Sequence, residues 1–144
     1  MVRTIAGVVL GYVVFALILF ATFSTAYLTM GAGRAFLPGS YEVSPLWLGV
    51  SVFFGFAAAL VGGYVAATVS RGTRAPLVLA CALLVLGVIV AIPALGKPDP
   101  GPRAGDVGNT AAMTNARQPA WFLFLSPVIS AAGILVGSRL RRRA

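Results

Sequence analysis

Long apolar segments alternate with short polar ones along the whole chain. Four of them, residues 5–28, 46–69, 77–95 and 120–137, contain no Asp, Glu, Lys or Arg. A helix rises about 1.5 Å per residue and the hydrocarbon core of a bilayer is about 30 Å thick, so about 20 apolar residues span it. In lipid, a helix satisfies its own backbone hydrogen bonds. The pattern predicts an all-α integral membrane protein, a four-transmembrane-helix bundle that forms a single domain.

The composition favours a bilayer over water as the environment of this chain. Hydrophobic residues make up 59% of the sequence and charged residues 10%, and the mean hydropathy is +0.95. A soluble domain of this size would have too little polar surface to face water. The first apolar segment is longer than the h-region of a cleaved signal peptide, which has about 7–15 residues. We therefore expect this segment to be retained as the first span.

Charge differs between the two sides that four spans would create. One side holds basic residues only: Arg3, Arg71, Arg74, Arg139, Arg141, Arg142 and Arg143. The other side mixes Arg34, Lys97, Arg103 and Arg117 with all three acids, Glu42, Asp99 and Asp106. Because basic residues near span ends favour the cytoplasm, we expect both termini to be cytoplasmic (N-in/C-in). The many Arg, Ala and Gly residues favour a bacterial origin, hence a bacterial cytoplasmic membrane.

The pI of 11.2 would suggest a nucleic-acid partner if the protein were soluble. Here the basic residues fall in short gaps between apolar runs, which is the pattern of membrane topology. We expect no nucleic-acid partner. The basic tail, Arg139, Arg141, Arg142 and Arg143, is instead expected to contact anionic lipid headgroups.

The motif Pro-x-Trp occurs twice, at Pro45–Trp47 and Pro119–Trp121, each time before an apolar run. Proline suits the first turn of a helix, and tryptophan suits the membrane interface. We expect Trp47 and Trp121 to be interfacial anchors on the outer side. The repeated motif is also compatible with two hairpins in a weak parallel repeat. The sequence shift that superposes Trp47 on Trp121 also superposes Ala59 and Gly63 on Gly133 and Gly137.

Small residues spaced four apart predict close contacts between membrane helices. The second span carries the longest such line, so we expect it to lie centrally. The predicted packing residues are Gly55, Ala59, Gly63, Ala67, Gly133 and Gly137.

Hydroxyl side chains gather in the outer and middle parts of three predicted spans. These are Thr22, Thr25, Thr29, Ser51, Ser126 and Ser130. Two roles are open for these hydroxyls. They form hydrogen bonds to the backbone and between helices, or they line a shallow polar vestibule that is open to the outside. Pro127 lies inside the fourth span and should free a carbonyl beside two of the serines. The connection 96–119 is rich in Gly and Pro, so we expect an irregular, mobile outer loop.

Reactive groups are scarce. The chain has no His, a single Cys and three acids, all of which fall in predicted loops. It therefore lacks the usual general base, a dithiol pair and a set of metal ligands. We expect no enzymatic activity, no cofactor and no metal.

Three functions remain open. The first is an accessory or structural membrane protein that binds lipids and other membrane proteins, or itself, without chemistry of its own. The second is a passive pore or uncoupled carrier for a small neutral solute, through the polar vestibule. The third is a lipid-reading sensor or assembly factor that uses the basic tail.

Overall fold

The protein is described by a computed structural model that covers residues 1–72 and 74–143, with side chains through Arg141. Its helices are α1 (Val2–Met30), α2 (Ala32–Ala35), α3 (Pro45–Ser70), α4 (Arg74–Leu95), α5 (Asn109–Asn115) and α6 (Ala120–Arg143). Four of these, α1, α3, α4 and α6, are long and apolar enough to cross a membrane. No strand forms in the described ranges. An all-helical chain with four candidate spans is therefore confirmed.

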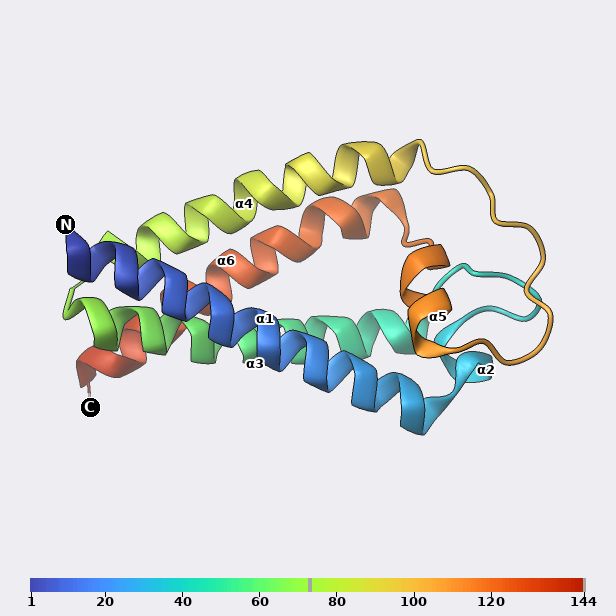
Figure 1. The fold of residues 1–144 in the computed structure, drawn as a ribbon, viewed down its shortest axis with the longest axis horizontal. Coiled ribbons are helices and arrows are strands. Elements are labelled where there is room, and N and C mark those ends of the chain that lie inside the picture. Colours follow the sequence, from blue (N-terminus) through green and yellow to red (C-terminus); the bar gives the residue numbers. More distant parts are fainter. Residues whose placement is uncertain (73, 144) are drawn as a thin grey trace.

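The four long helices lie side by side in two directions (Figure 1). α1 and α4 run away from the end that holds both termini, and α3 and α6 return to it. α3 packs chiefly on α1 and α6, and α4 packs chiefly on α6. We call the end with the termini the terminal end and the opposite one the cap end.

Glycine lets the helix backbones touch in the half of the bundle near the terminal end. A Cβ on Gly63 of α3 would lie 2.1 Å from the carbonyl oxygen of Ile134, and one on Gly137 of α6 would lie 2.0 Å from that of Leu60. On the other side of α3, a Cβ on Gly11 of α1 would lie 2.8 Å from the Gly62 carbonyl oxygen. These distances leave no room for any side chain, so backbone contact closes this half of the bundle.

The cap end is built from the connection between α1 and α3 and the connection between α4 and α6, which pair with each other. Isolated bridges join Phe36 to Val43 and Glu42 to Arg117. The Arg117 amide donates to the Tyr41 carbonyl at 2.9 Å, so residues far apart in sequence share backbone bonds. A small apolar cluster lies beneath, formed by Tyr27, Ala32, Ala35, Phe36, Val43 and Ala112.

The prediction of an irregular loop over residues 96–119 was wrong for residues 109–115. They form α5, and Ala112 on this helix is 3% exposed. The Tyr27 hydroxyl donates to the Val107 carbonyl at 2.6 Å, and the Asn109 amide donates to Ser24 Oγ at 3.1 Å. Long-range contacts to α1 therefore order a segment that has no apolar periodicity of its own.

The first Pro-x-Trp motif begins a helix in the way its residues predict. Pro45 occupies the first turn of α3, and Ser44 caps it by accepting a bond from the Trp47 amide at 3.1 Å. The Ser44 hydroxyl also donates to the Arg34 carbonyl at 2.5 Å, which ties the cap to the connection before it. Pro119 stands directly before α6, where its carbonyl accepts from the Phe122 amide at 2.9 Å.

Candidate functional site

The six hydroxyl residues singled out in the sequence do not share one recess. Thr22, Thr25 and Thr29 line a groove between α1 and α3, whereas Ser51, Ser126 and Ser130 line a cavity among α1, α3 and α6. The two sets line different recesses of the bundle. A single outer vestibule is therefore absent from the described structure.

The first recess, which we call the threonine groove, has a volume of about 410 Å³. Its walls are Ala21, Thr22, Thr25, Ala26, Thr29 and Met30 of α1, with Val50 and Phe54 of α3. The Thr22 hydroxyl donates to the Ile18 carbonyl at 2.7 Å, and the Thr29 hydroxyl donates to the Thr25 carbonyl at 2.9 Å. Because these two hydroxyls are satisfied within α1, the groove is largely apolar.

The second recess, the serine cavity, has a volume of about 140 Å³. Three hydroxyls and the Gln118 side chain supply its polar groups, and Leu19, Phe23, Val52, Gly55, Phe122 and Ile129 supply the other walls. Every one of these residues is uncharged. The cavity can therefore offer hydrogen bonds but no ion pair.

Ser51 is the most deeply buried of the three hydroxyl residues that line the serine cavity. It is 7% exposed, and its Oγ atom is buried with no hydrogen-bond partner among the described residues. By contrast, Thr68, Ser70 and Ser138 each donate to a carbonyl of their own helix at 2.7–2.8 Å. A buried hydroxyl without a partner costs about 1–3 kcal/mol, so this one needs an explanation.

The predicted packing residues separate into two groups. Gly63, Gly133 and Gly137 meet the facing helix closely: a Cβ on Gly133 would lie 2.7 Å from the Ala59 methyl. Ala59 and Ala67 are buried on α3. Gly55 is also buried, yet a Cβ there would meet nothing within 4 Å in the described structure. This glycine borders the serine cavity instead of a helix contact.

The two tryptophans have different surroundings. Trp121 is 59% exposed. Trp47 is half-buried, and its ring lies edge-on to Tyr27 with centroids 6.2 Å apart. It therefore packs into the cluster at the cap end.

Basic side chains surround the terminal end. Arg3, Arg71, Arg74 and Arg139 are exposed, and Arg141 is half-buried. The side chains of Arg142 and Arg143, the other two residues of the predicted lipid-contact tail, lie outside the described residues.

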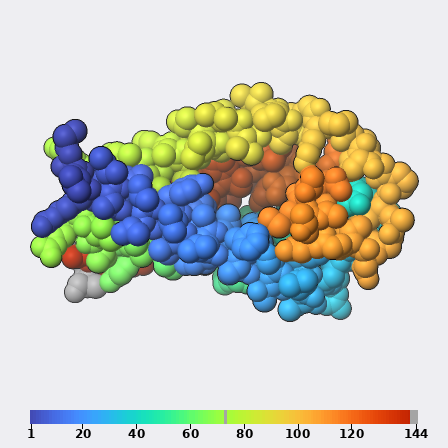
Figure 2. Space-filling model, in the orientation of Figure 1, coloured from blue at the N-terminus to red at the C-terminus, as the bar shows by residue number. Residues whose placement is uncertain are grey.

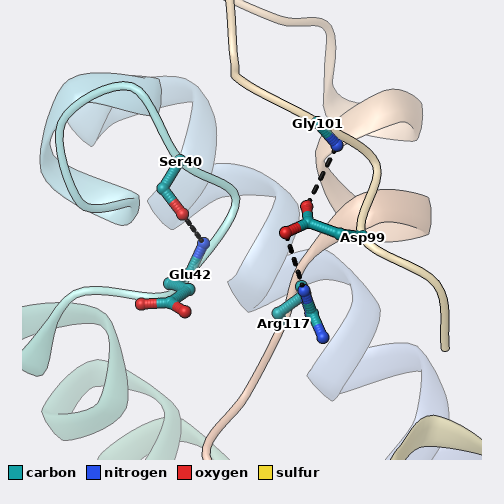
Figure 3. Close-up of polar contacts among 5 residues, drawn as sticks. All are labelled: Ser40, Glu42, Asp99, Gly101 and Arg117. Atoms are coloured by element: carbon teal, nitrogen blue, oxygen red, sulfur yellow. Dashed lines mark hydrogen bonds and ion pairs between the residues drawn. The ribbon is translucent and has the colours of Figure 1, made fainter. Parts of the chain in front are cut away.

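At the cap end, Arg103 and Arg117 make contacts with other groups of the protein. Figure 3 shows Asp99 between the Gly101 amide, at 3.0 Å, and the Arg117 guanidinium, at 3.3 Å. Arg103 lies over the Phe36 ring, 5.7 Å from its centroid, and donates from Nε to the Ser40 carbonyl at 3.1 Å. The two ends therefore differ in net charge and in how their charges are satisfied.

The described residues contain no group of three or more His, Cys, Asp or Glu side chains that could hold a metal. Cys81 lies on α4 with an exposed side chain. Sequence reasoning missed Gln118 and Phe23 as walls of the serine cavity. Gln118 directly precedes the second Pro-x-Trp motif, which was the one available signal that it lies near the outer end of α6.

Comparison with protein-family models, curated proteins and solved structures finds no match to this chain.

Proposed function

We propose that the protein is an accessory component of a membrane assembly, which receives a transmembrane helix of a partner protein in the threonine groove. The observation that carries this proposal is a line of small residues that no helix of the bundle covers. Ala21, Thr25 and Thr29 are spaced four apart on α1, and all three are exposed. Small residues at this spacing let two membrane helices approach closely.

The other small-residue faces support this assignment because the bundle already uses them. Gly11 of α1 meets Gly62 of α3, and Gly63 meets α6. α1 therefore uses its half near the terminal end for close backbone packing, and in the half near the cap end the face with Ala21, Thr25 and Thr29 stays uncovered. The hydroxyls of Thr22 and Thr29 are satisfied within α1, so a docked apolar helix would leave neither of these two unpaired.

The proposed setting is a bacterial cytoplasmic membrane, with the terminal end in the cytoplasm. Support comes from the charges: Arg3, Arg71, Arg74 and Arg139 are exposed at that end, which has no acidic residue. Each basic residue near an anionic surface contributes about 1 kcal/mol to attraction. Lipid contact by the basic tail, Arg139, Arg141, Arg142 and Arg143, is thus part of the same proposal. No further observation supports a separate function as a lipid sensor.

A passive pore through one copy is the weaker alternative. The serine cavity would supply its outer half, but the path would then have to cross the contacts of Gly63 with Ile134 and of Gly137 with Leu60. Backbone atoms in direct contact offer no passage for a solute. The accessory function needs no such opening.

The two hairpins, α1–α3 and α4–α6, are proposed to be repeats. Ala59 and Gly133 occupy equivalent positions under the shift that superposes the two tryptophans, and they face each other across the α3–α6 contact. A parallel repeat about an axis along the bundle would place equivalent residues together in this way.

Photo-crosslinking in native membranes tests the docking proposal. A benzophenone amino acid at Phe54, a wall of the groove, should give one discrete protein product that Thr25→Leu abolishes by filling the groove. The same group at Phe53, which is 68% exposed, is the control and should give lipid adducts only. Equal products from both positions, or a product at Phe54 that Thr25→Leu leaves unchanged, would contradict the proposal.

A further inference from the structure

The serine cavity carries a separate inference, because one of its polar groups lacks a partner. Ser51 is 7% exposed, and its hydroxyl makes no hydrogen bond to any described residue. In hydrocarbon surroundings a serine ordinarily bonds a carbonyl of its own helix, as Ser70 does at 2.7 Å. The Ser51 hydroxyl therefore has unused hydrogen-bonding capacity, and the residue lines the cavity.

Room for that molecule is provided by Gly55, one turn along α3 from Ser51. A Cβ at Gly55 would meet nothing within 4 Å in the described structure, unlike one at Gly63, so packing does not require glycine here. Both residues line the cavity of about 140 Å³. A cavity of about 150 Å³ holds one benzene molecule, which sets the size of an occupant.

The walls define the chemistry of the occupant. Hydroxyls of Ser51, Ser126 and Ser130 and the Gln118 amide can each donate and accept, whereas Leu19 and Phe23 offer apolar surface. With no charged residue in the lining, an ion would lose its hydration without replacement. The matching ligand is uncharged, carries a hydroxyl or similar group, and has about the bulk of one six-membered ring.

A second cavity adjoins the serine cavity at the cap end. A neighbouring cavity of about 170 Å³ lies under α5 and shares Phe23 and Gln118 with the serine cavity. The bonds of Tyr27 to Val107 and of Asn109 to Ser24 hold α5 over it. Figure 2 shows the molecule hollowed between α1, α4 and α5, with α6 behind. The entrance for a ligand is therefore expected on the side of the cap end.

We propose that the serine cavity is a binding site for a small, neutral, hydroxyl-bearing solute that enters from the outer side and bonds Ser51. The site does not depend on the threonine groove, so it stands or fails separately from the accessory function. It also needs no passage through the glycine-packed half of the bundle. Binding, and not permeation, is its activity.

Fluorine NMR on the full chain in detergent micelles tests this site. The probes are para-fluorobenzyl alcohol and para-fluorotoluene, which differ by one hydroxyl, and empty micelles correct for partitioning. The alcohol should bind saturably and about tenfold more tightly than the toluene, because a site with buried polar groups discriminates against a ligand that leaves them unpaired.

Variants locate the binding. Ser51→Ala should weaken the binding of the alcohol about three- to tenfold, since one hydrogen bond is lost, and should leave the affinity for the toluene unchanged. Gly55→Leu should abolish the binding of both probes by filling the cavity. Thr25→Leu, in the threonine groove, should change the affinity for neither probe. Equal affinity for the two probes, an alcohol signal that survives Gly55→Leu, or a cavity that takes up water alone would overturn the proposal.

Discussion

Gly63 of α3 lies against the backbone of Ile134 of α6, so closely that a Cβ on the glycine would stand 2.1 Å from the Ile134 carbonyl oxygen. Two backbones in contact cannot move apart without disturbing the whole interface. Gly137 repeats the relationship in the other direction, against Leu60. This reciprocal pair fixes the spacing of α3 and α6 along the half of the bundle near the terminal end.

Gly63→Ala is expected to lower the free energy of unfolding by about 1–3 kcal/mol, because the added methyl overpacks a contact made by backbone atoms. Gly55→Ala is the matched control on the same helix and should cause no loss, since its methyl meets open space. Equilibrium unfolding in mixed micelles measures both. Equal losses for the two variants would mean that the contact at Gly63 does not set the interface.

Gly87 and Pro127 form a second close contact, between α4 and α6. A Cβ on Gly87 would lie 2.1 Å from Cγ of the Pro127 ring. Gly87→Ala should therefore destabilise the bundle, and adding Pro127→Ala should recover at least about 1 kcal/mol by removing the ring. A double-mutant cycle by equilibrium unfolding gives this coupling. Strict additivity of the two changes would show that the ring and the glycine do not meet.

Ser51→Ala is expected to raise the free energy of unfolding of the ligand-free protein by about 1 kcal/mol, because it removes a buried hydroxyl that lacks a partner. Ser138→Ala is the control. That serine is also buried, but its hydroxyl donates to the Leu135 carbonyl at 2.7 Å, so its loss should lower stability. Opposite signs for the two serines are the expected outcome, and a matching loss at both would contradict the assignment of Ser51.

Tyr27→Phe is expected to loosen the connection between α4 and α6. The change removes the bond from the Tyr27 hydroxyl to the Val107 carbonyl, which is worth about 1 kcal/mol, or about a fivefold change in an opening equilibrium. Trypsin cleavage after Arg103 should therefore be about fivefold faster. Tyr12→Phe, in the middle of α1, should leave the rate unchanged. The same rate for both variants would show that Tyr27 does not hold α5 in place.

The four spans could be predicted from the sequence because each span carries its own signal. An uncharged apolar run of sufficient length must be helical in lipid whatever surrounds it, and the predicted ranges fall inside the helices found. Ser44 and Pro45 are a local signal as well, since they mark the start of α3 without help from distant residues. The cap end could not be predicted, since α5 and the bridge of Glu42 to Arg117 depend on contacts between distant segments.

For the candidate site, the sequence predicts the position of each residue along its helix but not the direction in which its side chain points. Counting along each helix places Thr25 and Ser51 in the half near the cap end, whereas the rotation of each helix, and so the recess that each residue faces, is set by packing. Gly55 and Gly63 likewise have surroundings that their sequence positions do not predict. They belong to one line of small residues, yet one borders a cavity and the other meets a backbone, because a helix follows its neighbour over only part of its length.

Cysteine accessibility in intact cells tests most directly whether the chain crosses the membrane four times with the terminal end in the cytoplasm. In a Cys81→Ser background, single cysteines replace Val2, Gly72, Ala104 and Leu140, and a membrane-impermeant maleimide reports their side. We expect labelling of Ala104→Cys from outside, and labelling of the other three only after the membrane is permeabilised. Outside labelling of Gly72→Cys, or labelling of Val2→Cys and Leu140→Cys on opposite faces of the membrane, would contradict this topology.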